Sequence, residues 1–207
     1  MSLKKNPAAR RTTAAAKTTD NTFLGCPETG LTAGGNLPAP HQRESNKLKN
    51  RNTAPASINA QVTLDKMLKP GSDKTRFKNT FGATITGFLA NAARSDDPGG
   101  ESCNCHSANP NLDDFHLDLV ADKTQITKSN RVIVEITPRW RARLGDFGKL
   151  TTLQALAKRK AKVRVTGWMF FDEAHTSQAD NTKPGSAGNW RATCWEIHPV
   201  TRFAVLD

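Results

Sequence analysis

After residue 80, the chain consists of short runs in which apolar and polar residues alternate. Residues 115–120 and 131–137 alternate strictly, which predicts strands with one buried and one outward face. The buried faces are expected to carry Phe115, Leu117, Leu119, Val132, Val134 and Ile136. The outward face of the second run is expected to carry Ile133, Glu135 and Thr137. Further apolar runs predict strands over 83–90, 162–171 and 190–206.

A helix interrupts this series of strands. Leu150, Leu153 and Leu156 recur at helical spacing, and the basic residues 158–160 suit the C-terminal end of a helix. Three strands, a helix and two further strands are the order of an OB-fold, a five-stranded Greek-key barrel with a helix between its third and fourth strands. Gly87 and Gly167 are typical of points where a barrel strand bends. We therefore predict a mainly β, OB-like barrel with one helix over residues 81–207.

The first 80 residues lack this alternation. Up to residue 40 the chain is rich in Ala, Thr, Asn, Gly and Pro and has no acidic residue before Asp20. We therefore predict a disordered basic tail over residues 1–45. Residues 46–80 are expected to form a linker with one short helix over 63–68, capped by Thr63.

The net charge of +11 lies mostly in the N-terminal part. Residues 1–80 hold 14 basic and 5 acidic residues, a balance of +9, and the rest hold 16 and 14, a balance of +2. A flexible cationic tail binds phosphate groups through its charge. A solubilising arm without a fixed partner, or an organellar transit peptide, would have the same composition.

Several classes of protein are not expected from the sequence. Apolar runs fall short of the roughly 18 residues that span a bilayer, and the early Lys and Arg residues precede Thr and Ala rather than the apolar segment of a secretory signal. We therefore expect no membrane partner and a cytoplasmic location. Phosphate-binding loops and the serine-hydrolase elbow are also missing.

One candidate site lies on the outward face of the sheet. Alternation places Glu196 and His198 on one face of the last strand, and an OB-like strand order brings that face beside His116 and Glu135. Two histidines and two carboxylates within reach of one another could bind a divalent metal or supply an acid/base pair, with Glu135 and Glu196 as the catalytic candidates. An ordinary solvated face of salt-bridged residues would show the same pattern.

A second candidate site is the run Cys103-Asn-Cys105-His106. Cys103, Cys105 and His106 are three possible ligands for zinc or another divalent metal. Four cysteines in this chain are few for a disulfide scaffold, and Cys103 and Cys105 are too close in sequence to bridge each other, so we interpret the cysteines as thiols or metal ligands. A reduced, exposed loop is the alternative.

Aromatic and cationic residues cluster after the third predicted strand and at the start of the last. Trp faces stack on bases and Arg neutralises phosphates, so the two clusters could form a groove for single-stranded nucleic acid. The residues of this predicted groove are Arg139, Trp140, Arg141, Arg143, Trp190 and Arg191.

Several segments resemble a group of bacterial proteins of unknown function with an OB-like domain. They are Glu101-Ser-Cys-Asn-Cys-His106, Asp114-Phe-His-Leu117, Val134-Glu-Ile-Thr-Pro-Arg139, Val165-Thr-Gly-Trp168 and the strand Trp195-Glu-Ile-His-Pro-Val-Thr201. The resemblance covers residues 46–207. It places Asp114, His116, Glu135, Glu196 and His198 within recognisable motifs and implies no particular activity for them.

Three hypotheses follow from the sequence. The first is a nonenzymatic OB-like module that binds single-stranded nucleic acid. The second is a metal-dependent hydrolase or phosphodiesterase using His116, Glu135, Glu196 and His198. The third is a protein-interaction domain whose loop at 103–106 holds a structural zinc ion.

Overall fold

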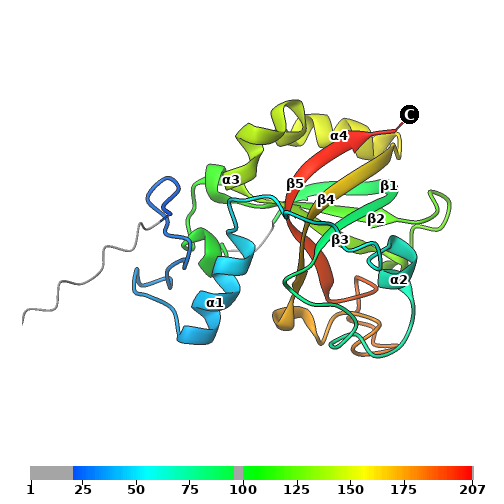
Figure 1. Cartoon of the computed structure of the whole chain (residues 1–207), viewed down its shortest axis with the longest axis horizontal. Coiled ribbons are helices and arrows are strands. Elements are labelled where there is room, and N and C mark those ends of the chain that lie inside the picture. The colour runs from blue at the N-terminus through cyan, green and yellow to red at the C-terminus, as the bar shows by residue number, and fades with distance from the viewer. Residues whose placement is uncertain (1–20, 96–99, 207) are drawn as a thin grey trace, which may run out of the picture.

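The computed structural model describes residues 21–95 and 100–206, which form a closed five-stranded barrel (Figure 1). Its strands are β1 (Gly82–Arg94), β2 (Phe115–Val120), β3 (Val132–Ile136), β4 (Lys162–Phe171) and β5 (Trp195–Val205). They close in the order β1-β2-β3-β5-β4, with β3 and β5 parallel and the other neighbours antiparallel. The predicted mainly β, five-stranded barrel is confirmed, and residues 190–194, predicted as strand, precede β5.

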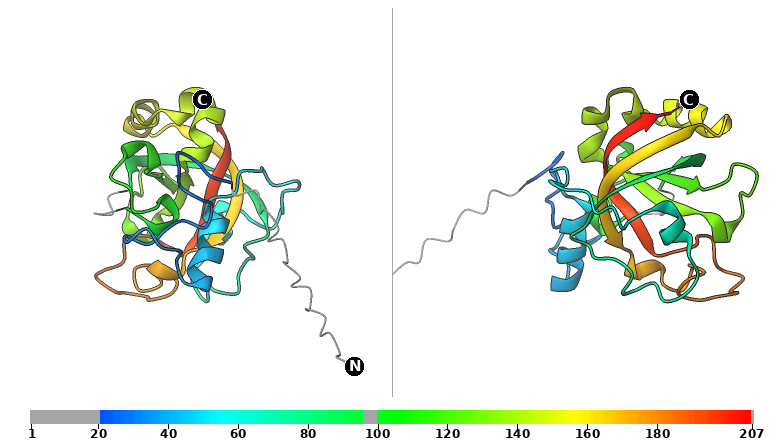
Figure 2. Two further views of the ribbon diagram at one scale, coloured as in Figure 1. Left: turned by 90° about the vertical axis from the view of Figure 1, so that its left-hand side faces the viewer. Right: turned by 45° about the vertical axis from the view of Figure 1, so that its right-hand side comes forward.

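The helices lie on the outside and at the ends of the barrel. They are α1 (Pro40–Lys49), α2 (Leu64–Leu68), α3 (Pro138–Arg141) and α4 (Leu150–Lys158), with short 3-10 turns between them. The helix predicted between the third and fourth strands is α4. In Figure 1 and in the right-hand view of Figure 2, α1 and α2 lie on opposite sides of the barrel. None of the helices within residues 21–95 and 100–206 is long and apolar enough to cross a membrane.

The barrel interior holds the residues that the alternation predicts. The inward-facing side chains of β2 and β3 belong to one apolar core with those of β1, β4 and β5. The short helix α2 adds Leu64 and Met67 to that core. Its cap is the predicted one, because the Thr63 hydroxyl accepts a hydrogen bond from the Lys66 amide at 3.2 Å.

The two strand glycines permit close packing. A Cβ atom on Gly167 would lie 2.2 Å from the Pro199 carbonyl oxygen, and the pairing of β4 with β5 shifts register at this glycine. A Cβ atom on Gly87 would lie 2.8 Å from a Leu64 methyl group. The bulge of β1 lies between Leu89 and Asn91 instead of at Gly87. Only Gly167 therefore marks an irregular point of a strand, as predicted.

The folded part of the chain begins earlier than predicted. Residues 1–20 of the predicted tail lie outside the described residues, whereas residues 21–45 have a defined structure that includes the start of α1. Arg139 donates hydrogen bonds to the carbonyl oxygens of Asn21 and Cys26 at 2.8 and 2.9 Å. The predicted boundary at residue 45 is therefore wrong. The order comes from contacts with residues more than 100 positions away, which local composition does not indicate.

The outer face of β3 is covered as well. Ile133, Glu135 and Thr137 point away from the barrel core as predicted, yet their exposed fractions are 0%, 5% and 1%. Helix α1 and the turn at 102–104 contact each other, and α1 also contacts β5. The alternative interpretation, an ordinary solvated face, is therefore wrong for these residues.

Candidate functional site

Four residues predicted to share the outer face do lie together. His116 and Glu135 are direct partners in the pairing of β2 with β3, and β5 runs parallel beside β3. His198 Nδ1 lies 3.2 Å from Glu135 Oε2 and 3.4 Å from Glu196 Oε2. His116 Nδ1 lies 3.9 Å from Glu135 Oε1. The strand register therefore assembles the predicted histidine and carboxylate cluster.

Asp114, which directly precedes β2, completes this cluster. Its Oδ2 lies 3.6 Å from His198 Nε2. Ligand atoms of Asp114, Glu135 and His198 all lie within 4.8 Å of one another, and all three residues are buried. A histidine nitrogen and two carboxylate oxygens at this spacing are a plausible donor set for a divalent cation. This candidate ligand group contains His198 but not His116, the other predicted histidine ligand.

The cluster contains buried polar atoms without hydrogen-bond partners. Within the described residues these atoms are His116 Nε2 and His198 Nε2. The carboxyl groups are partly paired, because Asp114 interacts with the Asn104 side chain and Glu135 Oε2 lies near His198 Nδ1. Burial, reinforced by the Glu196 charge, raises the pKa of Glu135 well above its usual value. Burial also raises the pKa of Asp114. In the metal-free protein the environment therefore disfavours the charged form of both carboxyl groups.

Arg191 anchors the other side of the cluster. It is fully buried, and its Nη1 donates to Glu196 Oε1 at 2.7 Å and lies 3.3 Å from Asp172 Oδ2. Burial alone would lower the pKa of Arg191, but the two carboxylates raise it. Asp172 also bonds to the ring of His175. Glu196 is thus held as the partner of a buried cation.

The N-terminal segment contributes one further cation. Lys49, in the last turn of α1, forms an ion pair with Glu101. Burial alone would raise the pKa of Glu101, but Lys49 lowers it to about 2. The Lys49 ammonium also lies 5.5 Å from the ring centre of Phe170, which contacts the His198 ring. Helix α1 therefore brings a positive charge to the edge of the cluster.

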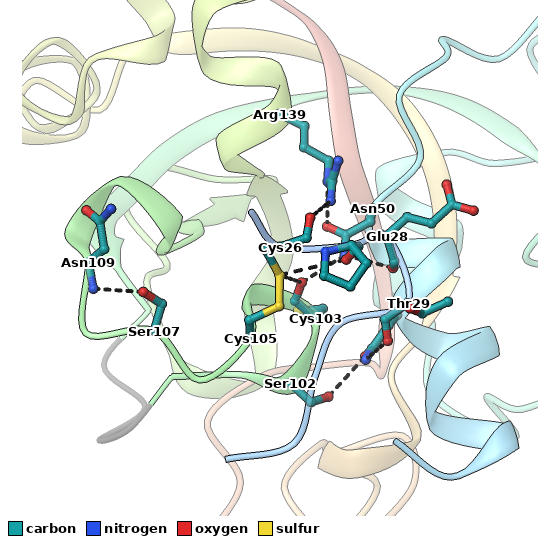
Figure 3. The surroundings of a disulfide bond; sticks show 12 residues. Cys26, Glu28, Thr29, Asn50, Ser102, Cys103, Cys105, Ser107, Asn109 and Arg139 are labelled. Carbon is teal, nitrogen blue, oxygen red and sulfur yellow. Dashed lines mark hydrogen bonds between the residues drawn. A yellow bond between two sulfur atoms is a disulfide. The ribbon is translucent and has the colours of Figure 1, made fainter. Parts of the chain in front are cut away.

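The predicted Cys103, Cys105 and His106 ligand set is not assembled. Cys105 forms a disulfide with Cys26, as Figure 3 shows, so the interpretation of these two cysteines as thiols or metal ligands is wrong. His106 belongs to no metal-ligand group among residues 21–95 and 100–206. Cys103 stays a free, buried thiol and donates to Glu101 Oε2 at 3.2 Å. The partner of Cys105 was missed because Cys26 lies 79 positions away in the predicted tail.

The predicted nucleic-acid groove does not form as a surface. Arg139, Trp140 and Arg191 are buried, and the Trp140 indole donates to the Arg51 carbonyl oxygen at 2.8 Å. Arg143 is exposed and stacks on Trp140 instead of pointing away from the protein. The predicted groove is absent because these three buried residues, half of the predicted set, bind the N-terminal segment or the buried carboxylates instead.

Two of the groove residues lie elsewhere at partly exposed positions. The Arg141 guanidinium packs on the Phe115 ring at 3.9 Å. Trp190 lies edge to face with His116 and with His175, with both pairs of ring centres 5.4 Å apart. These three rings form a partly exposed rim beside the buried cluster.

Sequence reasoning did not assign Lys49, Glu101 or Asp172 to the cluster. Lys49 belongs to a basic run that is typical of a solvated helix, so its sequence carries no signal of burial. Asp172 stands three residues before His175, and this spacing is a local signal that could have indicated an aspartate and histidine pair. Asp114 was marked only through the resemblance.

Comparison with known proteins adds no assignment. The chain matches no protein-family model, and no curated protein sequence and no solved structure is significantly similar to it. The function is therefore argued from the site itself.

Proposed function

We propose that this protein is a metal-dependent hydrolase of phosphodiesters, with a divalent cation bound by Asp114, Glu135 and His198. The observation that carries the proposal is that ligand atoms of these three buried side chains lie within 4.8 Å of one another, while His198 Nε2 has no hydrogen-bond partner within the described residues. Buried polar groups in folded proteins are normally paired, and each unpaired group costs about 1 to 3 kcal/mol. A bound cation would take one ligand atom from each of the three side chains.

The charge around the site supports a cation. The cluster contains five buried or partly buried carboxyl groups and only two positively charged side chains. The carboxyl groups are Glu101, Asp114, Glu135, Asp172 and Glu196, and the cations are Lys49 and Arg191. With all of them ionised and the histidines neutral, the cluster carries a charge of 2 − 5 = −3. A divalent cation offsets most of this excess, which burial otherwise makes unfavourable.

The neighbouring residues suit a hydrolytic reaction. A divalent cation polarises a phosphoryl oxygen and activates bound water. We assign His116 to proton transfer, because its side chain is 25% exposed and its Nε2 has no hydrogen-bond partner within the described residues. Glu196, held by Arg191, is assigned to orienting His198 through its contact with Nδ1.

The charge of the chain favours an anionic substrate. A net charge of +11 attracts anions to the protein. The rim formed by His116, His175 and Trp190 combines protonatable rings with an aromatic surface. These groups suit a phosphodiester that carries an aromatic substituent, such as a nucleobase.

Metal binding and turnover test the proposal directly. Isothermal titration with Mn²⁺ and Zn²⁺ is expected to show binding that His198→Gln weakens at least 10- to 100-fold. His41→Gln, at an exposed position of α1, serves as the matched control and is expected to bind like the unchanged protein. Bis(p-nitrophenyl) phosphate is expected to be hydrolysed only with metal. Equal metal affinity of both variants, or no binding at all, would contradict the proposal.

A second candidate function, binding of single-stranded nucleic acid, is supported by a separate hollow. This hollow of about 490 Å³ is lined by Gln61, Lys66, Lys69, Pro70, Ser72, Arg76, Phe77 and Phe81. Its lining combines three cations with the partly buried ring of Phe81 and contains no carboxylate, a combination that favours binding of phosphates and bases.

Fluorescence anisotropy with a labelled single-stranded oligonucleotide tests this candidate. Lys66→Glu/Lys69→Glu is expected to weaken binding at least tenfold and to reduce its salt dependence. Lys128→Glu/Lys183→Glu changes the net charge equally at exposed positions away from the hollow. Equal losses in both double variants would show attraction by net charge alone and would contradict a site in the hollow.

A further inference from the structure

A second group of potential metal ligands adjoins the first. Ligand atoms of Glu101, Cys103 and Asp114 also lie within 4.8 Å of one another. Glu101 and Cys103 come from the turn that precedes Cys105, and the disulfide to Cys26 ties this turn to the N-terminal segment (Figure 3). Asn50 donates to the Cys103 carbonyl oxygen at 2.8 Å. Covalent and hydrogen bonds thus hold this turn against the cluster.

Asp114 belongs to both groups of ligands. It is 1% exposed, and its carboxyl group interacts with the side chains of Asn104 and His198. One oxygen, Oδ2, is 3.6 Å from the imidazole of His198 in the first group. A buried carboxylate that belongs to two adjacent ligand sets is suited to bridge two metal ions, which lie roughly 3.5 to 4 Å apart in dinuclear hydrolase sites.

We propose that the protein binds a second divalent cation through Glu101, Cys103 and Asp114, so that the centre is dinuclear and Asp114 is its bridging ligand. This inference rests on the proposed function for the first cation. The thiol ligand selects a thiophilic ion such as Zn²⁺ or Co²⁺ over Mg²⁺. A second cation would add positive charge on the phosphoryl oxygens of the substrate.

Lys49 is the counter-ion of this second position in the metal-free protein. Its ammonium group pairs with the Glu101 carboxylate that the cation would use. The Cys103 thiol, which donates to the same carboxylate, would release its proton to solvent when the metal-sulfur bond forms. Entry of the cation therefore replaces both the Lys49 ion pair and the thiol hydrogen bond. Lys49→Met is expected to raise affinity for the second ion, because it removes the competing charge.

Cobalt titration tests the second position by spectroscopy. In the oxidised protein, Co²⁺ is expected to bind at two equivalents and to give a near-ultraviolet band from charge transfer between thiolate and cobalt. Cys103→Ser is expected to lose this band while keeping one equivalent of metal. Cys194→Ser, which changes the other free, buried cysteine, is expected to keep the band and both equivalents. Reducing thiols are omitted, since they bind cobalt and open the disulfide.

The outcomes separate the two proposals. One equivalent of cobalt without a thiolate band would overturn the second position and leave the first intact. A thiolate band that persists in Cys103→Ser would overturn the assignment of the ligand. No bound cobalt would overturn both proposals. Because a serine at 103 could disturb packing, Glu101→Gln provides a second test, and it is expected to weaken the band-forming equivalent at least tenfold relative to the exposed control Glu173→Gln.

Discussion

On β3, the residues that point into the barrel and those that point away from it differ in chemistry and hardly at all in burial. Val132, Val134 and Ile136 are fully buried among apolar side chains. Glu135, on the opposite face, is 5% exposed and lies among charged groups. Both faces are produced by one alternating sequence, yet the inner apolar residues and Glu135 contribute to the free energy of folding in opposite directions.

The inner row stabilises the fold, whereas the buried carboxyl group of Glu135 on the outer face makes it less stable. Removing apolar side chains from water contributes about 25 cal/mol for each Å² of buried apolar surface. Burying carboxyl groups without full pairing is unfavourable, and well-packed apolar residues often give equal or greater stability at such sites. A polar cluster that is retained under a covering segment therefore indicates a functional role. The comparison predicts that changes on the two faces will affect stability differently.

Removing the disulfide is expected to have the largest effect. Cys26→Ser/Cys105→Ser opens a loop with a sequence separation of 79, and loop entropy predicts a loss of about 4.5 kcal/mol in the free energy of unfolding. Urea denaturation measures this loss, and treating the unchanged protein with a reductant should reproduce it. Cys194→Ser should stay within about 1 kcal/mol. A loss below about 1 kcal/mol in the double variant would show that the N-terminal segment is held by its other contacts.

Arg191→Met is expected to cost about 4 kcal/mol, because it leaves the buried carboxylates of Glu196 and Asp172 without their shared cation. Adding Glu196→Gln to this variant should recover part of the loss, since one unpaired charge is removed. Chemical denaturation of the two variants at pH 7 measures the difference. Equal stability of the single and double variants would argue that Glu196 does not depend on Arg191.

Leu117→Ala tests the inner face at the position between His116 and Asp118 on β2. Leu117 is fully buried in the apolar core, and truncation is expected to cost about 3 kcal/mol through lost apolar burial and the cavity left behind. Thermal and urea unfolding measure the change. Metal affinity should stay unchanged, since the ligands lie on the other face. A large loss of metal affinity in the folded variant would show that the two faces are coupled.

The sequence indicated the inner face and the helix between the third and fourth strands because both signals are local. Strict alternation in residues 115–120 and 131–137 and the leucine spacing in 150–158 need no knowledge of distant contacts. The same alternation placed His116, Glu135 and His198 on one side, and the barrel order then brought them together. This much of the candidate site follows from periodicity and topology.

The cover over the site could not be predicted in the same way. Residues 21–45 have the composition of a disordered tail, and they are ordered through Arg139 and the bond between Cys26 and Cys105. Both links join positions far apart in the sequence, and neither has a periodic signature. Arg139 and Arg191 were therefore interpreted as surface cations, although each is buried as a hydrogen-bond donor.

Glu135→Gln gives the smallest expected change in the free energy of unfolding. The variant is expected to be more stable than the unchanged protein, whereas Leu117→Ala is expected to be less stable. Burial raises the pKa of Glu135 in the folded protein above its unfolded value, so the folded state holds a proton that the unfolded state releases. The free energy of unfolding of the metal-free protein therefore falls as pH rises from about 4.5 through the folded-state pKa. Glutamine stays neutral, so the variant should gain about 1 kcal/mol over the unchanged protein at pH 8 and nothing near pH 4.

Unfolding in urea with a chelator, at several pH values, measures this difference, and the exposed Glu173→Gln should show none. The pH dependence that Glu101 contributes has the opposite sign. Its folded-state pKa of about 2 lies below its unfolded pKa, so the stability that its carboxylate contributes is lost only as pH falls below the unfolded pKa. With saturating metal the unchanged protein should be more stable than Glu135→Gln, since it gains binding energy that the variant has lost. A variant that is less stable at every pH without metal would show that the Glu135 carboxylate is stabilising by itself, and the contrast between the two faces of β3 would then fail.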